Sequence, residues 1–511
     1  MVAHPREIEI KLAATPAMLE ALRKHPQLAG EDCTATLVTT YFDTSGGRLR
    51  RGGAALRIRD DGRGREQTLK LASPQGAAVR RNEWNVAVAA DLPEPSDFPK
   101  NARSSLARLL GGDPLEPVAT TRIERTTRRL HSGSSAIEIA FDVGTVEAGG
   151  RTQALCEFEM ELVEGHLADV IALALKLPLG PDLSWSITSK AERCHALAYD
   201  MLPAAAHAKP VKLSSAMNVA RGFQAIAWNC LDQLLANYPL VIATGDPEGI
   251  HQARVAIRRL RAAGTLFGDL TGEGAGPVLR AELKAVASGL GRARDMHVLF
   301  ERVAKAARGS DGDLDDMLAH LAEQRDKAVA SAQAMLAAEP FQRLLFEFAE
   351  WLEAGDWLSR RGEAGGEQPL LPFASGVLSR RRRKLRRVRD RIADLPDAKR
   401  HRLRIDVKKL RYANAFFASL FTDRARTKHK AFFTKALGQL QDSLGDLNDM
   451  AVAAAGRGQL FADLEVIDAA RQSAQLDGVL VAEEKSRRKL FKAAEKSLAV
   501  IVGTPAWWKV D

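Results

Sequence analysis

The sequence EIEIK at residues 7–11 alternates charged and apolar side chains. A period of two is typical of a β-strand, because successive side chains point to opposite faces. Two carboxylates and an ammonium therefore share one face, and two isoleucines take the other. A single half-buried strand with a solvated polar face would also explain this pattern, so its meaning depends on whether it recurs.

The same alternation returns in five later segments: ALRIR (55–59), TLKLA (68–72), RRNEWNVAV (80–88), IEIAFDV (137–143) and CEFEMEL (156–162). The charged faces carry both signs, and the three glutamates of CEFEMEL would repel one another unless a cation lay between them. We therefore expect a closed antiparallel barrel with a charged lumen, whose apolar residues face outward against helices or a partner domain.

The two signs of charge indicate the chemistry of this lumen. Carboxylates hold a hard divalent cation, whereas Arg and Lys hold an anion, and the guanidinium group suits phosphate oxygens in particular. A site that needs both signs at once fits a magnesium–polyphosphate substrate.

The first two-fifths of the chain resembles the CYTH domain family. The resemblance rests on an ordered set: EIEIK, TYFDT (40–44), LRIR, TLKL, the strand with Glu83, a strand with Arg125, Phe141–Asp142 and EFEMEL. The family includes adenylate cyclases of one class, thiamine triphosphatases and inorganic triphosphatases. The resemblance implies an eight-stranded antiparallel tunnel that takes a triphosphate along its axis.

The resemblance also implies roles for single residues. Those that would hold Mg²⁺ or Mn²⁺, directly or through water, are Glu7, Glu9, Asp142, Glu157 and Glu159. Those that would cradle phosphates are Lys11, Arg57, Arg59, Lys70, Arg125 and Lys190, and Glu83 belongs to the same lumen. Which two of Glu157, Glu159 and Glu161 match the metal-binding pair of the family is open. The general base is not readable from the sequence, and Lys11 with Tyr41 is one candidate arrangement.

Length, composition and charge limit the number of domains, the compartment and the kind of partner. A chain of 511 residues indicates two or more domains. No apolar run approaches the ~18 residues of a membrane span, and four scattered cysteines without CxxC spacing favour a reducing, cytoplasmic compartment. Residues 1–205 carry 25 Lys and Arg against 27 Asp and Glu, whereas residues 206–511 carry 49 against 37. The excess positive charge therefore indicates an anionic partner for the second part only.

The second part contains an internal repeat of helical periodicity. HQARVAIRRLRAAGTLF (251–267) corresponds to HRLRIDVKKLRYANAFF (401–417), and LGRARDM (290–296) corresponds to LGDLNDM (444–450). We therefore expect an α+β protein with a tunnel domain at residues 1–203, a linker at 204–212, and an all-α duplicated bundle at 213–511. The two copies would cover about 213–360 and 370–511.

The repeated helix has an apolar stripe and a basic face. The basic residues of the two copies are His251, Arg254, Arg258 and Arg261, and His401, Arg404, Lys408 and Arg411. A solvated face would explain one such helix, but cations without intervening acids repel one another, and a bound anion would relieve this. This part resembles the CHAD domain family, which implies binding of inorganic polyphosphate and association with polyphosphate granules.

Together these resemblances imply a metal-dependent triphosphatase that cleaves tripolyphosphate to pyrophosphate and phosphate, by in-line attack of water. Three alternatives stay open: adenylate cyclase or thiamine triphosphatase activity in the tunnel, a non-enzymatic polyphosphate scaffold, and nucleic-acid binding. The last lacks aromatic residues interleaved with the basic ones for base stacking. The sequence specifies no oligomeric state. Since every expected lumen residue lies within residues 1–205, we expect this part to be active alone.

Overall fold

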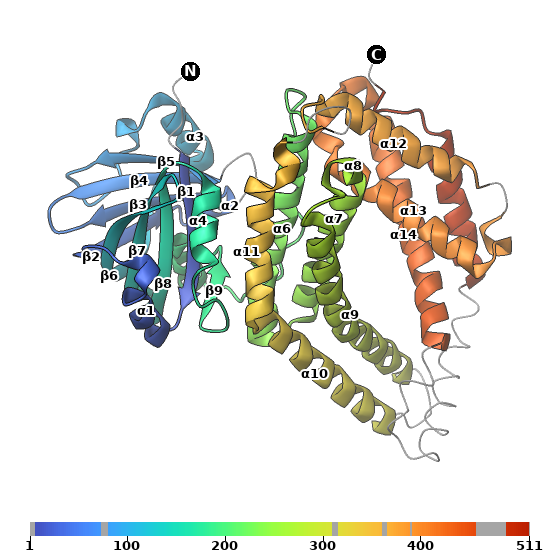
Figure 1. Ribbon diagram of the computed structural model, residues 1–511, viewed down its shortest axis with the longest axis horizontal. Coiled ribbons are helices and arrows are strands. Elements are labelled where there is room, and N and C mark those ends of the chain that lie inside the picture. The colour runs from blue at the N-terminus through green and yellow to red at the C-terminus, as the bar shows by residue number, and fades with distance from the viewer. Residues whose placement is uncertain are drawn as a thin grey trace. The chain divides into compact units, whose positions relative to one another are not determined.

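A computed structural model describes residues 6–72, 80–308, 315–359, 365–388, 391–455 and 487–509 (Figure 1). The chain forms two compact units. The first comprises residues 1–207, 231–252 and 334–355, and the second comprises 208–230, 253–333 and 356–511. The expected second copy of the helical repeat includes residues 389–390, 456–486 and 510–511, which lie outside the described residues.

The first unit is built on one antiparallel sheet. Its strands are β1 Arg6–Ala14, β2 Cys33–Asp43, β3 Ala54–Asp60, β4 Arg65–Ala72, β5 Arg80–Ala87, β6 Glu116–Ser132, β7 Ser135–Ala148, β8 Arg151–Glu164 and β9 Leu183–Ser186. The order is β5-β4-β3-β2-β6-β7-β8-β1-β9, and an additional pairing of β5 with β1 closes the ring. The ring thus has the expected eight strands, and the sheet has a ninth, β9, which the sequence analysis did not include.

Strand β1 has neighbours on both sides, and its charged residues Glu7, Glu9 and Lys11 line the cavity inside the ring. Lys11 pairs with Glu159 of β8 and with Ser186 of β9, and Glu7 pairs with Arg81 of β5. All six alternating segments of the sequence are strands. The alternation therefore predicted both the secondary structure and the face that each side chain takes.

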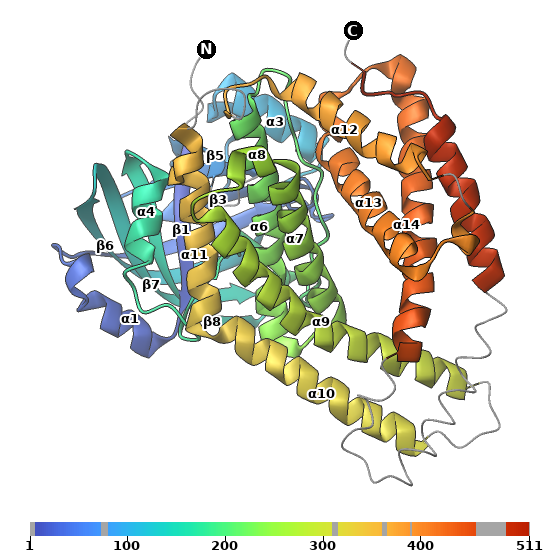
Figure 2. The same ribbon diagram turned by 45° about the vertical axis from the view of Figure 1, so that its right-hand side comes forward.

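The apolar outer face of the ring is covered by helices. Leu56, Leu69 and Trp84 form a buried cluster with Phe98 and Leu106, which belong to the segment that contains helix α3 (Lys100–Leu110). The other helices of residues 1–207 are α1 Pro16–Arg23, α2 Arg48–Arg51, α4 Leu167–Ala174 and α5 Lys190–Ala198. Helix α4 packs against α11 (Glu339–Ala354), which lies beside it in both ribbon views (Figures 1 and 2).

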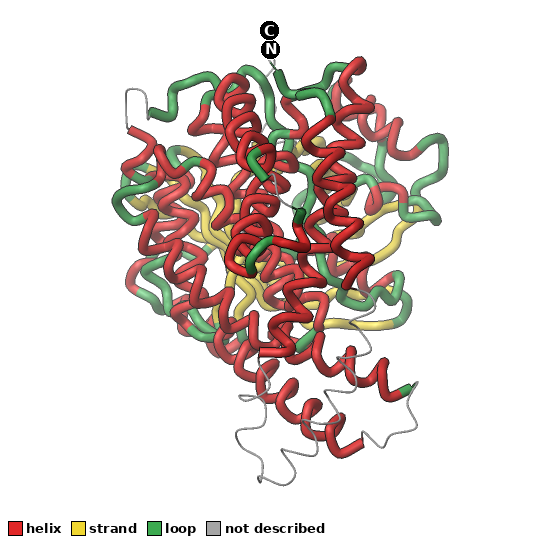
Figure 3. The backbone as a smooth tube through the Cα atoms, turned by 90° about the vertical axis from the view of Figure 1, so that its right-hand side faces the viewer, coloured by secondary structure: helices red, strands yellow, loops and turns green. Residues whose placement is uncertain are grey.

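The rest of the described chain is helical. Its helices are α6 Val219–Thr244, α7 Pro247–Leu266, α8 Gly268–Thr271, α9 Gly276–Ala307, α10 Asp315–Ala337, α12 Leu370–Arg386, α13 Asp397–Phe416 and α14 Thr427–Ala455. A further helix covers residues 487–503. Within the described ranges all strands belong to the single sheet, drawn in yellow in Figure 3.

The repeated sequence segments lie on two pairs of helices. The two copies of the histidine-containing segment lie in α7 and α13, and the two later segments lie in α9 and α14. The predicted apolar stripe is core, since Ile257, Leu260, Val407 and Leu410 are at most 3% exposed. Among the described residues, no helix is long and apolar enough to cross a membrane.

The expected linker has no regular structure, but it is attached to a helix. The backbone N–H of Ala206 donates to the Asn237 side chain of α6, and that side chain donates back to the Ala206 carbonyl. Cys33, Cys156 and Cys194 are free thiols. Residues 231–252 and 334–355 pack with the tunnel rather than with the other helices, which was not foreseen.

Candidate functional site: a charged tunnel lumen

The lumen of the strand ring contains a cavity of about 240 Å³. The expected site residues that line it are Glu7, Glu9, Lys11, Tyr41, Arg57, Arg59, Lys70, Glu83, Arg125, Glu159 and Lys190. Asp142 and Glu157 are fully buried and contact Lys190, which lines the cavity. The structure therefore brings all the predicted tunnel residues into one region. It adds Glu161 to the lining, together with Glu66, Asn85 and Glu138.

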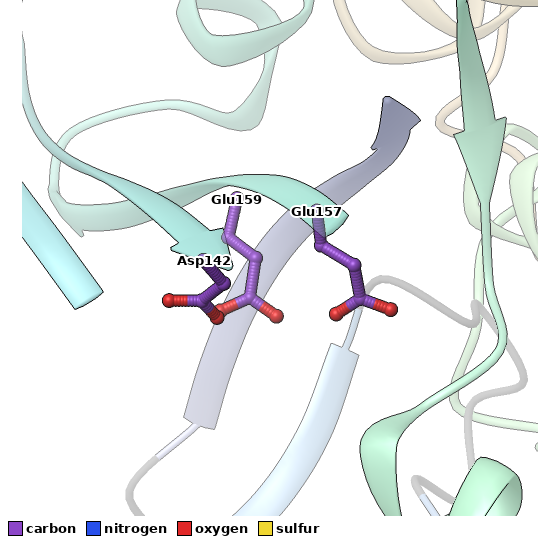
Figure 4. Close-up of side chains that lie close together, drawn as sticks. All are labelled: Asp142, Glu157 and Glu159. Carbon is purple, nitrogen blue, oxygen red and sulfur yellow. The ribbon is translucent and has the colours of Figure 1, made fainter. Parts of the chain in front are cut away.

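One acidic cluster consists of Asp142, Glu157 and Glu159, which come from the neighbouring strands β7 and β8. Each offers a carboxylate oxygen, and these oxygens all lie within 4.8 Å of one another. The three side chains point to the same side of the sheet (Figure 4). This spacing would suit a hard cation, but protein cations already lie there.

The cations of this cluster are Lys190 and Arg125. The Lys190 ammonium lies 2.8, 2.9 and 2.7 Å from carboxylate oxygens of Asp142, Glu157 and Glu159. Arg125 donates two hydrogen bonds to Asp142, of 2.7 and 2.6 Å, and one of 2.5 Å to Glu159. Such bidentate, charge-assisted contacts are the strongest hydrogen bonds that a protein makes.

These contacts fix the charges of the cluster. Burial alone would raise the pKa of Glu159, but Lys190, Lys11 and Arg125 hold the pKa well below its usual value. Burial likewise opposes the charge of Lys190, yet Asp142, Glu159 and Glu157 raise its pKa. Asp142 and Glu159 are therefore held as carboxylates by protein cations, and an added metal ion would have to compete with Lys190.

A second acidic group, Glu7, Glu9 and Glu161, is less fully compensated. Lys70 lies 2.5 Å from Glu7 and Lys11 lies 3.8 Å from Glu9, but Glu161 makes no ion pair among the described residues. Burial, together with the nearby Glu7 and Glu9 carboxylates, raises the pKa of Glu161 to about 7. One oxygen of Glu7, Oε2, is buried and has no hydrogen-bond partner among the described residues. Glu9 lies opposite Glu161 in the β1–β8 pairing. The three carboxylates line the same cavity, and one Glu7 oxygen is unpartnered, so the residues present offer the oxygen ligands that a hard divalent cation takes.

Around Arg57 and Arg59 the excess charge is positive. The pKa of Arg59 falls to about 10, because Arg57 lies beside it, the group is buried and Arg125 is also near. The Nε atoms of both arginines are buried without a hydrogen-bond partner in the described part of the chain. Like charges held together in a buried site are stabilised when an anion binds between them.

The remaining lumen residues connect these two groups. Lys70 lies 2.5 Å from Glu7 and 3.0 Å from Glu83, and Glu83 lies 3.8 Å from Arg57. Burial lowers the pKa of Lys11, but Glu9 and Glu159 outweigh it and raise that pKa overall. A protonated Lys11 cannot accept a proton. Tyr41, the other half of the suggested general base, hydrogen-bonds to Arg57.

The second unit brings the basic helices of the two repeats together. Arg258 of α7 donates a hydrogen bond to the Tyr412 hydroxyl of α13. Arg254 donates to the Gly291 carbonyl and to Asp295 of α9. His251, Arg261, Arg404 and Lys408 are half-buried, whereas His401 and Arg411 are exposed. The side chain of Arg259, from the same basic run, is directed inward, where it bonds to Asn229 and lies over the Phe416 ring.

Comparison with known families matches this geometry to two domains. Residues 5–194 match the model of the CYTH domain, and residues 225–456 match the model of the CHAD domain. The chain carries a CYTH domain followed by a CHAD domain. The inferred tunnel thus coincides with the CYTH match, and both copies of the basic helix lie within the CHAD match.

Two relatives support these assignments. The CYTH domain is similar to an inorganic triphosphatase of Haemophilus influenzae, with 31% identity over 202 residues. This match covers 38% of the chain and 55% of the relative, so the chain spans about half the length of this curated protein. The CHAD domain is similar to the crystal structure of a CHAD domain from the plant Ricinus communis, at 27% identity and a TM-score of 0.50. That match covers 58% of this chain and 96% of the plant chain.

Proposed function

We propose that the CYTH tunnel hydrolyses inorganic tripolyphosphate to pyrophosphate and phosphate with a bound Mg²⁺ or Mn²⁺ ion. One observation carries the proposal: a single lumen holds crowded carboxylates around Glu161 and crowded guanidinium groups around Arg59. One Glu7 oxygen and the Nε atoms of both arginines have no hydrogen-bond partner among the described residues. A metal–polyphosphate complex supplies both charges at once. The similarity of the CYTH domain to an inorganic triphosphatase supports the same activity.

The two acidic groups take different roles in this proposal. Glu7, Glu9 and Glu161 would hold the ion, which supplies positive charge to the phosphate oxygens and orients them. Asp142, Glu157 and Glu159 instead hold Lys190 and Arg125 in place through the ion pairs described above. Of the residues first expected to bind metal, we thus keep two for direct contact and assign the other three to positioning cations.

The cations would bind and stabilise the substrate. Arg57 and Arg59 have unpartnered nitrogens in the described lumen, so phosphate oxygens can accept from them without the loss of an existing contact. Lys11, Lys70, Arg125 and Lys190 add positive charge along the same cavity. Water would attack a terminal phosphoryl group in line, and these fixed cations would stabilise the charge that develops on its oxygens.

We further propose that the CHAD domain binds inorganic polyphosphate. The contact between Arg258 and Tyr412 holds the basic faces of α7 and α13 beside each other, so that cations from both repeats can contact one polyanion. The net positive charge of residues 206–511 supports this role.

The decisive experiment is phosphate release from tripolyphosphate, ATP and thiamine triphosphate, each with and without Mg²⁺. We expect turnover of tripolyphosphate, dependent on the metal and faster than that of either organic triphosphate. Faster turnover of ATP or thiamine triphosphate would support one of the alternative activities, and full activity in excess EDTA would refute the metal site.

A further inference from the structure

A set of aromatic side chains attaches two helices to strand β9 within the first unit. The Trp185 ring of β9 stacks on the Phe346 ring of α11, with centroids 4.2 Å apart and planes inclined by 12°. The Tyr238 hydroxyl of α6 donates a hydrogen bond to the main-chain carbonyl of Trp185. All three side chains are at most 1% exposed. These contacts are therefore part of the core that surrounds the tunnel, although Tyr238 and Phe346 lie far along the chain from it.

Strand β9 needs such support because it is short. It has four residues and pairs along β1, with Trp185 opposite Leu12 and Ser186 opposite Lys11. A two-stranded pairing of this length is marginal by itself. A buried tryptophan removes roughly 150–250 Å² of surface from water. The contacts with Phe346 and Tyr238 thus add buried packing and a hydrogen bond to the pairing of β9 with β1.

Strand β9 is adjacent to two lumen cations. Ser186 lies beside Lys11 of β1, and the chain then runs through residues 187–189 to Lys190 at the start of α5. Lys190 contacts the three carboxylates of the compensated cluster at 2.7–2.9 Å. A displacement of β9 would therefore be transmitted both to Lys11 and to Lys190.

We propose that Phe346 and Tyr238 are positioning residues of the tunnel site, which act through β9 on Lys11 and Lys190. The inference rests on the proposed function of the tunnel. It departs from the expectation that residues 1–205 suffice for full activity, because α11 and the second part of α6 complete the site. Misplacement of catalytic groups by about 1 Å can cost as much as 10²-fold in rate.

The test compares full-length variants that lose the same volume in the two units. Phe346→Ala removes the ring under Trp185, and Phe433→Ala removes a fully buried ring that packs on Trp508 in the second unit. Both are assayed on tripolyphosphate well below their Tm. We expect Phe346→Ala to lower kcat/KM about tenfold or more, and Phe433→Ala to change it less than twofold. Equal rates for wild type and a folded Phe346→Ala would overturn the proposal.

A second measurement does not depend on activity. Amide hydrogen exchange over residues 11–14 and 183–186 should accelerate in Phe346→Ala but not in Phe433→Ala, because only the first variant loosens β9. If Phe346→Ala does not fold, the same two measurements are made on Tyr238→Phe, which removes only one hydroxyl group. Exchange at β9 unchanged in the folded variant would refute the positioning role. Absence of tripolyphosphate turnover in the wild type would refute the proposed function instead, while the exchange result still reports on β9.

Discussion

Glu161 shows how one residue changes role with its neighbours. Glu157, Glu159 and Glu161 occupy equivalent positions on one strand, yet Glu159 is held ionised by three cations while the pKa of Glu161 is raised to about 7. The sequence shows the three carboxylates but not which cations face them, since that depends on the register of β8 with β1 and on where α5 begins. The alternation alone therefore could not separate metal ligands from ion-paired carboxylates.

Glu161→Gln is the direct test of this separation. The amide removes one charged ligand and leaves the shape, so we expect turnover at saturating tripolyphosphate to fall by about 10²-fold and the Mg²⁺ requirement to rise. Glu164→Gln is the control, because Glu164 lies on the same strand as Glu161 but is exposed and does not line the cavity. We expect less than a threefold change for it. Equal losses in both variants, measured as kcat against Mg²⁺ concentration, would contradict the assignment.

Arg59→Ala should separate stability from activity. The pKa of Arg59 is lower in the folded protein than its ordinary value, so its charge opposes folding at neutral pH where it is protonated. Its removal should leave the Tm without ligand unchanged or higher, while KM for tripolyphosphate rises by tenfold or more. Arg65→Ala, at a partly exposed arginine paired with Asp60, controls for loss of an arginine outside the cavity. If Arg59→Ala lowers the Tm of the protein without ligand and Arg65→Ala does not, the charge of Arg59 does not oppose folding and the interpretation is wrong.

His195 predicts a dependence of stability on pH away from the lumen. Burial lowers its pKa, as does the nearby Arg50, whereas Asp43 and Glu192 act in the opposite direction. The unfolded chain protonates His195 near pH 6.5, and the folded chain only at lower pH, so stability is lost as pH falls below about 6.5. His195→Gln should lose less stability than wild type between pH 7.5 and 5.5 in urea denaturation. Equal losses would show that His195 is not the group responsible.

At the scale of elements, the strands were predictable and their supports were not. Period-two alternation in EIEIK and CEFEMEL predicted the strands because each has a charged lumen face and an apolar outer face. Strand β9, with only four residues, has too short a pattern to be recognised. Helix α11 shows an amphipathic sequence, but nothing in that sequence indicates that its apolar face packs on α4 of the tunnel unit rather than within the helical repeat.

The repeated helices were predictable for a related reason. Duplication displays the same apolar stripe twice, and Ile257 and Val407 are both fully buried. The contact of Arg258 with Tyr412 could not be foreseen, because Tyr412 replaces an alanine at the corresponding position of the first copy, Ala262. Pairing between the copies thus depends on a residue in which the copies differ.

At the scale of the whole molecule, the proposals predict two separable anion sites. Charge reversal at Arg258 and Lys408 together should weaken binding of long-chain polyphosphate by at least tenfold, because both cations lie on the paired helices α7 and α13. The affinity that remains should depend less steeply on salt concentration. Binding that makes fewer phosphate contacts releases fewer counterions. Tripolyphosphate turnover should persist, because the lumen residues belong to the other unit.

Two control variants test whether the loss of polyphosphate binding is specific to Arg258 and Lys408. Lys305→Glu reverses an exposed cation near the end of α9, and Tyr412→Phe removes the partner of Arg258 without changing any charge. We expect little effect from the first and a small loss of affinity from the second, measured by titration with polyphosphate at several salt concentrations. Conversely, Glu161→Gln should lose tripolyphosphate turnover and still bind long-chain polyphosphate. A double reversal that abolished turnover as well, in a protein with unchanged Tm, would mean that polyphosphate and tripolyphosphate share one site and would refute the division of labour between the CYTH and CHAD domains.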